Sequence, residues 1–150
     1  MVIVVLEALP EKGVVKTLLN IFMKRCITNN NNPKVVVGRL IDSLQYLIPR
    51  IIENAKSYLG KDYDYEFDFE NDKIYCSELI YFAFQNKNSV SFFDGEVTPM
   101  TFFNSDTKKF NQYWVDYFQK LGKKIPEGKL GINPGGILKS KLLQIVHSFF

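Results

Sequence analysis

The sequence is poor in the residues that build metal sites and disulfide frameworks. Its 150 residues include two cysteines, Cys26 and Cys76, and one histidine, His147. Two cysteines are too few for a disulfide scaffold, and they lack the paired spacing of a structural zinc site. With one imidazole in the whole sequence, we expect neither a bound metal nor another cofactor.

Long hydrophobic runs and blocks of one charge are also missing. No apolar stretch approaches the roughly 18 residues of a membrane span. The apolar residues 2–6 lack the basic lead and longer core of a signal peptide. The 19 basic and 16 acidic residues give a net charge of +3, and the basic residues are scattered. We therefore expect no integral membrane segment and find no support for nucleic-acid binding, while the compartment stays open.

Hydrophobic and aromatic residues, by contrast, are abundant, at 46% and 15% of the sequence. This content excludes a disordered chain, and 150 residues is the size of one compact domain with its own core. No internal repeat and no linker interrupts the sequence. We predict a single domain over residues 1–150.

The mixture of strand and helix patterns predicts an α+β fold. Residues 2–6 are β-branched and apolar on both faces, which is typical of an interior strand, and residues 14–17 can return as the second strand of a hairpin. We interpret the glycines of residues 128–136 as a set of turns, and the structure of residues 63–69 stays open. The other predicted elements are helices at 18–25, 49–59, 76–84 and 110–121 and strands at 35–37 and 142–146.

Cys76 is the first candidate for chemistry, because it falls in the first turn of a predicted helix. The unpaired N–H groups and the positive dipole end of a helix favour a thiolate, which is the nucleophilic form of cysteine. The same N–H groups can hold a developing oxyanion, so one helix end serves both needs of acyl transfer. The alternative is structural: Cys76 is a small apolar residue on the stripe that it shares with Leu79 and Ile80.

Two motifs in the middle of the chain carry a resemblance to a known family. Residues 60–67 read GKDYDYEF, and after a short spacer residues 75–79 read YCSEL. Together they resemble the YiiX/YebB-like family of permuted NlpC-type papain-fold cysteine hydrolases. Further landmarks match near both ends of the chain, in residues 5–8, 13–14, 35–39, 134–135 and 140. The resemblance implies a permuted papain-like fold, in which an antiparallel sheet packs with helices.

The resemblance also implies catalytic roles for two residues. Cys76 matches the nucleophile of the family and Glu7 matches the acid that orients the catalytic imidazole. In this arrangement Cys76 attacks a carbonyl, an imidazole takes and returns the proton, and Glu7 stabilises the charged imidazole. Without the resemblance, Glu7 is a solvated acid near the end of a strand.

Four neighbours of these motifs are candidates for lining the substrate or holding the oxyanion. Tyr75 can offer its backbone N–H or its phenol, and Ser77 lies next to the nucleophile; a buried tyrosine and a helix cap are the structural alternatives. Tyr63 and Asp64 belong to the first motif, and the resemblance places them along the approach to Cys76.

The histidine departs from the pattern of the family. The resemblance implies a catalytic histidine on a strand that precedes the one carrying Glu7, and the sequence starts after that point. His147 follows Cys76 in an apolar context and does not match the family's histidine. We therefore expect an N-terminally incomplete domain, with three explanations open: a truncation, a strand supplied by another chain, or an inert relative. An exposed strand edge at residues 2–6 would favour pairing between copies of the chain.

Two hypotheses for function follow. The first is a thiol hydrolase that forms a thioester at Cys76, acting on a peptide, a cell-wall peptide or a lipid-like amide or ester. The second is a binding module for a peptide or lipid-like ligand that keeps the fold and the cleft without the base. Four phenylalanines around residues 99–100 either line an apolar groove for such a ligand or pack the core; they are Phe92, Phe93, Phe102 and Phe103.

Overall fold

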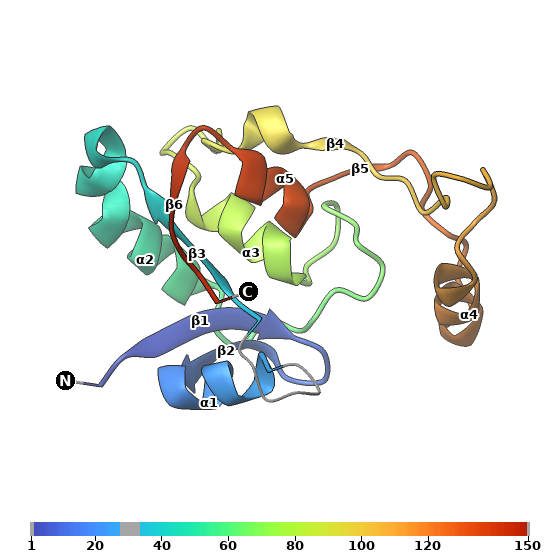
Figure 1. The fold of residues 1–150 in the computed structure, drawn as a ribbon, viewed down its shortest axis with the longest axis horizontal. Coiled ribbons are helices and arrows are strands. Elements are labelled where there is room, and N and C mark those ends of the chain that lie inside the picture. Colours follow the sequence, from blue (N-terminus) through green and yellow to red (C-terminus); the bar gives the residue numbers. More distant parts are fainter. Residues whose placement is uncertain (1, 28–33, 150) are drawn as a thin grey trace.

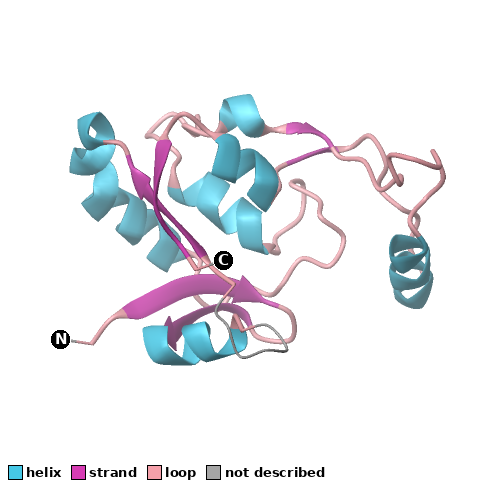
Figure 2. Cartoon of the chain, viewed as in Figure 1, coloured by secondary structure: helices cyan, strands magenta, loops and turns pink. Residues whose placement is uncertain are grey.

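The structure is a computed structural model that describes residues 2–27 and 34–149, and its mixed architecture confirms the predicted α+β class (Figures 1 and 2). In chain order the elements are β1 (Val4–Leu9), β2 (Gly13–Leu18), α1 (Leu19–Arg25), β3 (Val36–Leu40), the 3-10 helix η1 (Asp42–Leu47), α2 (Ile48–Ser57), α3 (Cys76–Ala83), the 3-10 helix η2 (Asp94–Glu96), β4 (Thr98–Pro99), α4 (Gln112–Leu121), β5 (Leu130–Gly131), α5 (Pro134–Lys139) and β6 (Leu143–Ser148).

The described strands form three antiparallel pairs, β1 with β2, β3 with β6 and β4 with β5. Within the described residues β1 pairs with β2 alone, so the prediction of an interior strand at residues 2–6 is wrong for this chain. In place of a second partner strand, the apolar residues of β1 contact the core and a cavity. Ala8 is buried in the core, and residues 5–9 line a cavity along the strand.

The hairpin of β1 and β2 fixes the segment that leads to Cys76. Gly13 has a φ of +66°, and a Cβ at this position would lie 2.0 Å from the carbonyl oxygen of Lys61. Only glycine permits this crossing, in which the N–H of Val14 donates to Lys61 O at 2.8 Å and the N–H of Gly60 donates to Val14 O at 2.9 Å. The first motif therefore starts at a fixed point on β2.

Helix α3 lies between two apolar clusters. Leu79 on this helix packs with Ala8 and Val14 of the hairpin, while Tyr75 at its N-terminus packs with Phe93 and Ile132. The start of the helix is thus held from both sides. Cys76 lies between the two clusters.

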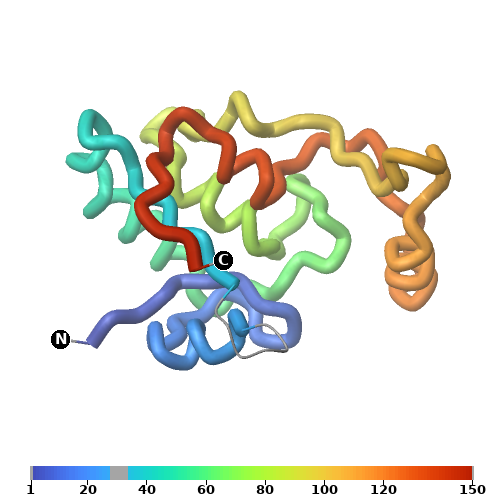
Figure 3. Tube along the Cα trace, viewed as in Figure 1, coloured from blue at the N-terminus to red at the C-terminus, as the bar shows by residue number. Residues whose placement is uncertain are grey.

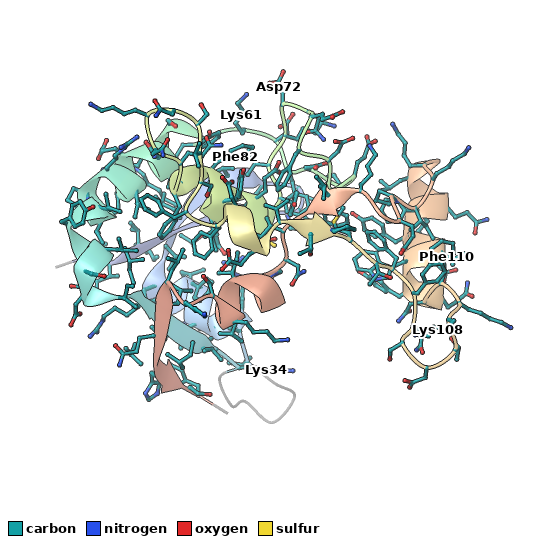
Figure 4. All side chains as sticks on the ribbon, turned by 90° about the horizontal axis from the view of Figure 1, so that it is seen from above. Lys34, Lys61, Asp72, Phe82, Lys108 and Phe110 are labelled. Atoms are coloured by element: carbon teal, nitrogen blue, oxygen red, sulfur yellow. The ribbon has the colours of Figure 1, made fainter. Side chains whose placement is uncertain are left out.

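Residues 98–131 form an arm that leaves the body along β4, carries α4, and returns along β5. In Figures 1 and 3 the two limbs run side by side, and α4 lies at the opposite end of the molecule from α2. Phe110 and Lys108 mark the outer end of this arm in Figure 4. The arm is tied back to the first motif, because the Tyr117 hydroxyl donates to Tyr65 O at 3.0 Å.

Most predicted helices and strands are present with shifted ends. Helix α2 begins at Ile48, one residue before its predicted start, α4 ends at Gly122 in the left-handed conformation, and β6 is the last strand. The interpretation of residues 128–136 as turns alone is wrong, since α5 begins there. Its start is stabilised by Asn133, whose Oδ1 accepts the N–H of Gly136 at 2.9 Å. In the part of the chain that the structure describes, no helix is long and apolar enough to cross a membrane.

Candidate active site around Cys76

Cys76 is the first residue of α3, and its side chain is exposed. Tyr75 before it has an extended backbone and is the N-cap of the helix. The first N–H groups of an α-helix have no partner within the helix, so they are available at this end for a ligand or an oxyanion. The helix start that the sequence predicted is confirmed.

The two neighbours of Cys76 are both anchored to Ile132, which follows β5. The Tyr75 hydroxyl accepts a hydrogen bond from the N–H of Ile132 at 3.1 Å, and the Ser77 hydroxyl donates to Ile132 O at 2.8 Å. Both side chains are buried, so these polar groups satisfy each other away from water. We call this reciprocal contact the Ile132 clamp. It uses the proton of the Ser77 hydroxyl and a lone pair of the Tyr75 hydroxyl oxygen.

Two cavities meet at Cys76. The first, which we call the aromatic cavity, has a volume of about 420 Å³ and is formed by the arm, the first motif and the segment after β5. Its lining residues are Phe67, Tyr75, Cys76, Ser77, Thr98, Pro99, Met100, Thr101, Phe102, Trp114, Ile132, Asn133 and Pro134. Of the four phenylalanines that the sequence singled out, Phe102 borders this cavity, whereas Phe93 is buried in the core.

The second cavity, the strand cavity, also measures about 420 Å³ and lies between β1, α2 and α3. It touches five successive residues of β1, so it runs along the strand, which within the described residues pairs with β2 alone. Glu7 and Cys76 are the ionisable residues in its wall. The full lining is Val5, Leu6, Glu7, Ala8, Leu9, Phe22, Ile51, Ala55, Cys76, Leu79, Ile80, Ala83 and Phe84.

Glu7 therefore shares a cavity with Cys76, as the sequence prediction requires. Its carboxylate is engaged, because Arg25 at the end of α1 donates a hydrogen bond to Glu7 Oε1 and forms an ion pair with it. The Glu7 side chain is 13% exposed and that of Arg25 is 40% exposed. Arg25 was not singled out from the sequence, where its one signal is a basic residue in the last turn of a predicted helix.

Glu78 is in the first turn of α3 and is fully buried. Its Oε2 accepts the N–H of Tyr75 at 3.1 Å, and its Oε1 has no hydrogen-bond partner among the described residues. Burial raises the pKa of Glu78 from an ordinary value of 4.5 to about 8; the hydrogen bond from Tyr75 opposes this shift, and the carboxylates of Asp64 and Asp68 add to it. At neutral pH the side chain mostly keeps its proton, so it opposes a thiolate at Cys76 only weakly.

Tyr63 and Asp64 are not among the residues that line the two cavities, and their place along the approach to Cys76 stays a prediction. Asp64 is fully buried, and its two oxygens accept the N–H groups of Glu66 at 2.7 Å and Asp68 at 2.6 Å. Burial, followed by repulsion from the Cys76 thiolate, raises the pKa of Tyr63. The pair shapes the loop of the first motif, and the cavity wall comes from Phe67 further along.

His147 lies on β6 opposite Val37, is exposed, and meets the ring of Phe149 edge to face with ring centroids 4.2 Å apart. It lines neither cavity that contains Cys76. The structure therefore separates the one histidine of the sequence from the candidate nucleophile. Among residues 2–27 and 34–149, no three His, Cys, Asp or Glu side chains gather where they could hold a metal ion.

This arrangement can be compared with known proteins. Residues 2–147 match the family described as permuted papain-like amidase enzyme, YaeF/YiiX, C92 family. The chain belongs to this C92 family. The match confirms the resemblance that the two motifs carried, and with it the permuted papain-like class of the fold.

Two relatives of this C92 chain come from Escherichia coli. The uncharacterized protein YiiX of strain K12 is 27% identical over 125 residues, which are 83% of this chain and 59% of that protein. The chain thus spans about three fifths of the length of this curated relative. A crystal structure described as metalloprotein YiiX from strain O157:H7 aligns with a TM-score of 0.70 at 23% identity, covering 97% of this chain and 75% of that one. This second likeness shows a shared fold.

Proposed function

We propose that this C92 chain carries the nucleophilic half of a thiol hydrolase that cleaves amide bonds of peptide or isopeptide type, or esters, through a thioester at Cys76. One observation carries the proposal. Cys76 is exposed at the first residue of α3, where two cavities meet, and one of them is bordered by Glu7. A nucleophile, oxyanion donors and an orienting acid then lie at one place.

In the first step, Sγ of Cys76 attacks the carbonyl carbon while the first N–H groups of α3 stabilise the oxyanion. The carbon–nitrogen or carbon–oxygen bond breaks, and the leaving group departs with a proton. Water then cleaves the thioester and restores the thiol. The Ile132 clamp holds both neighbours of Cys76 during these steps, so the thiol and the N–H groups keep a fixed relation.

We propose that the general base comes from outside this sequence, since His147 lies on β6 away from both cavities. The open edge of β1 supports this proposal, because backbone groups there are available to pair with an added strand. An imidazole carried by such a strand would enter the strand cavity between Glu7 and Cys76, where Glu7 would exchange its partner Arg25 for the imidazole. A segment outside the given sequence fits this role, whereas a second copy of the chain could offer only its His147 on β6.

The relative described as a metalloprotein raises the question of a metal in this chain. The donors do not fit, because the described residues bring no three metal-binding side chains together. We derive no step through a metal.

The experiment is acylation of the thiol by p-nitrophenyl acetate. Its leaving group departs as the p-nitrophenolate anion and needs no general acid to protonate it. We expect intact-mass spectrometry to find one acetyl group in wild type and in Cys26→Ser, and none in Cys76→Ser. Addition of free imidazole is expected to speed release of the acetyl group and permit turnover. Equal labelling of both cysteines, or none at Cys76, would contradict the proposal.

The distant position of the sole histidine favours a second candidate, a binding module that keeps the cavities without hydrolysis. It predicts ligand binding by Cys76→Ser as tight as by wild type, and no turnover with imidazole. The acylation experiment separates the two candidates.

A further inference from the structure

We infer that the aromatic cavity binds the acyl side of the substrate and selects an uncharged, apolar acyl group. The inference rests on the proposed function, because it names the substrate class of the same site. It follows from what lines the cavity and from the place of Cys76 between the two cavities.

The lining of the aromatic cavity contains no Asp, Glu, Lys, Arg or His. Met100, Phe102, Trp114 and Pro99 from the arm face Phe67 and Ile132 from the body, and Phe102 is buried beneath them. The ring of Trp114 meets those of Phe67 and Phe102 edge to face, at 5.8 Å and 5.2 Å between centroids. A charged group would lose water here without gaining a partner of opposite charge, since the polar side chains of the lining are neutral, whereas an apolar group gains the transfer free energy.

The size of the cavity also suits a small-molecule group. Its volume of about 420 Å³ lies in the range of ligand pockets, roughly 300–1,000 Å³. The rings pack in fixed edge-to-face geometry, so the cavity is formed before a ligand arrives and little ordering is required on binding.

The two cavities differ in which part of a substrate they can receive. The group that protonates the leaving amine must lie next to the orienting acid, and Glu7 borders the strand cavity alone. The leaving group therefore departs on the side of the strand cavity. The acyl part, which stays bonded to Sγ of Cys76 as the thioester, then extends to the opposite side, into the aromatic cavity.

Trp114 is the single tryptophan of the sequence, and it gives a direct readout of binding that does not depend on catalysis. We would titrate Cys76→Ser with straight-chain primary amides from butanamide to decanamide and follow the fluorescence of Trp114. We expect Kd to fall about fourfold for each added methylene until the cavity is full. An unchanged spectrum, or a Kd independent of chain length, would overturn the inference.

Two threonines on the arm supply a matched pair of variants. Thr101 borders the cavity and Thr107 does not; both are exposed, and each accepts the N–H two residues later at 3.4 Å. Aspartate can keep this hydrogen bond in either place. Thr101→Asp is expected to weaken octanamide binding about tenfold, whereas Thr107→Asp leaves it unchanged. Equal effects of the two variants would contradict an apolar site at this position.

Acylation of the wild-type thiol separates this inference from the proposed function. With p-nitrophenyl acetate, butyrate, hexanoate and octanoate, we expect the acylation rate of Cys76 to rise with chain length relative to that of free cysteine. Acylation at one rate for all four esters would overturn the inference and leave the hydrolase proposal standing. If the fluorescence depends on chain length but Cys76 is not acylated, the hydrolase proposal fails, while the binding of apolar groups in the aromatic cavity stands.

Discussion

The two sides of Cys76 differ in how many of their polar groups and strand edges have partners within the described residues. Toward β5, the hydroxyls of Tyr75 and Ser77 are both hydrogen-bonded to Ile132, and packed rings line part of the aromatic cavity. Toward β1, the strand cavity runs along an edge that, within the described residues, has no partner strand, and its one carboxylate is paired with Arg25. The chain thus completes the side that positions the nucleophile and leaves open the side where a base would act.

This difference predicts which interactions near Cys76 contribute to the stability of the chain. The groups of the Ile132 clamp are buried and hydrogen-bonded to one another, and Glu78 is buried with one of its two oxygens hydrogen-bonded, so changes there should alter stability. Glu7 and Arg25 lie at a partly exposed surface, where an ion pair contributes little to stability by itself.

The largest effect is expected from breaking the Ile132 clamp. In the double variant Tyr75→Phe, Ser77→Ala, the buried N–H and carbonyl of Ile132 lose their partners, at about 1–3 kcal/mol for each. We expect the free energy of unfolding, measured in urea, to fall by about 2–6 kcal/mol in total. Where the variant remains folded, the acylation rate of Cys76 should fall as well.

Ser57 offers a matched control for the clamp. Its hydroxyl also donates to a backbone carbonyl, that of Asn54 at 2.7 Å, but at an exposed position. Ser57→Ala should change the free energy of unfolding by less than about 0.5 kcal/mol. If Ser57→Ala and Ser77→Ala cost the same, the clamp is no stronger than a surface hydrogen bond and the contrast between the two sides is lost.

The next effect concerns pH and Glu78. Because burial raises the pKa of Glu78 in the folded protein to about 8, above its ordinary value of 4.5, the folded state holds a proton that the unfolded state releases. Its contribution to stability is fully present below about pH 4.5 and is lost as the pH rises through 8. The difference in stability between wild type and Glu78→Gln should therefore change by about 1–4 kcal/mol between pH 5 and 8.

Glu78→Gln keeps an acceptor for the N–H of Tyr75 and removes the titration, so its own stability should vary less over this range. Glu53→Gln is the control, because Glu53 is an exposed partner of Lys56. A constant difference between wild type and Glu78→Gln from pH 5 to 8 would show that Glu78 ionises normally in the folded protein.

The smallest effect is expected on the open side. Arg25→Ala removes the partner of Glu7, and we expect a loss of no more than about 1 kcal/mol in the free energy of unfolding, since the pair is partly exposed. High salt should reduce even this difference. A loss as large as that of the clamp variant would mean that the interactions on both sides of Cys76 contribute equally to the free energy of unfolding.

Much of the local structure could be predicted from the sequence. The apolar spacing after Cys76 predicted a helix that begins at this residue, Gly122 predicted the end of α4, and the motifs around Tyr63 and Cys76 led to the family. These signals lie within a few residues of the feature that they specify. The interior strand at residues 2–6 failed for a different reason, since apolar residues on both faces of a strand do not distinguish a second partner strand from a cavity along its edge.

The sequence by itself thus determined the α+β class, the family and the position of Cys76 at a helix start, because helix propensity, capping and turn chemistry act over a few residues. Tertiary structure decided what surrounds that cysteine. Ser77 meets Ile132 across 55 residues, and Arg25 meets Glu7 across 18. Such partners are chosen by packing of the whole chain and leave no periodic signal, so the Ile132 clamp, the aromatic cavity and the pairing of Glu7 with Arg25 emerge only when the core is formed.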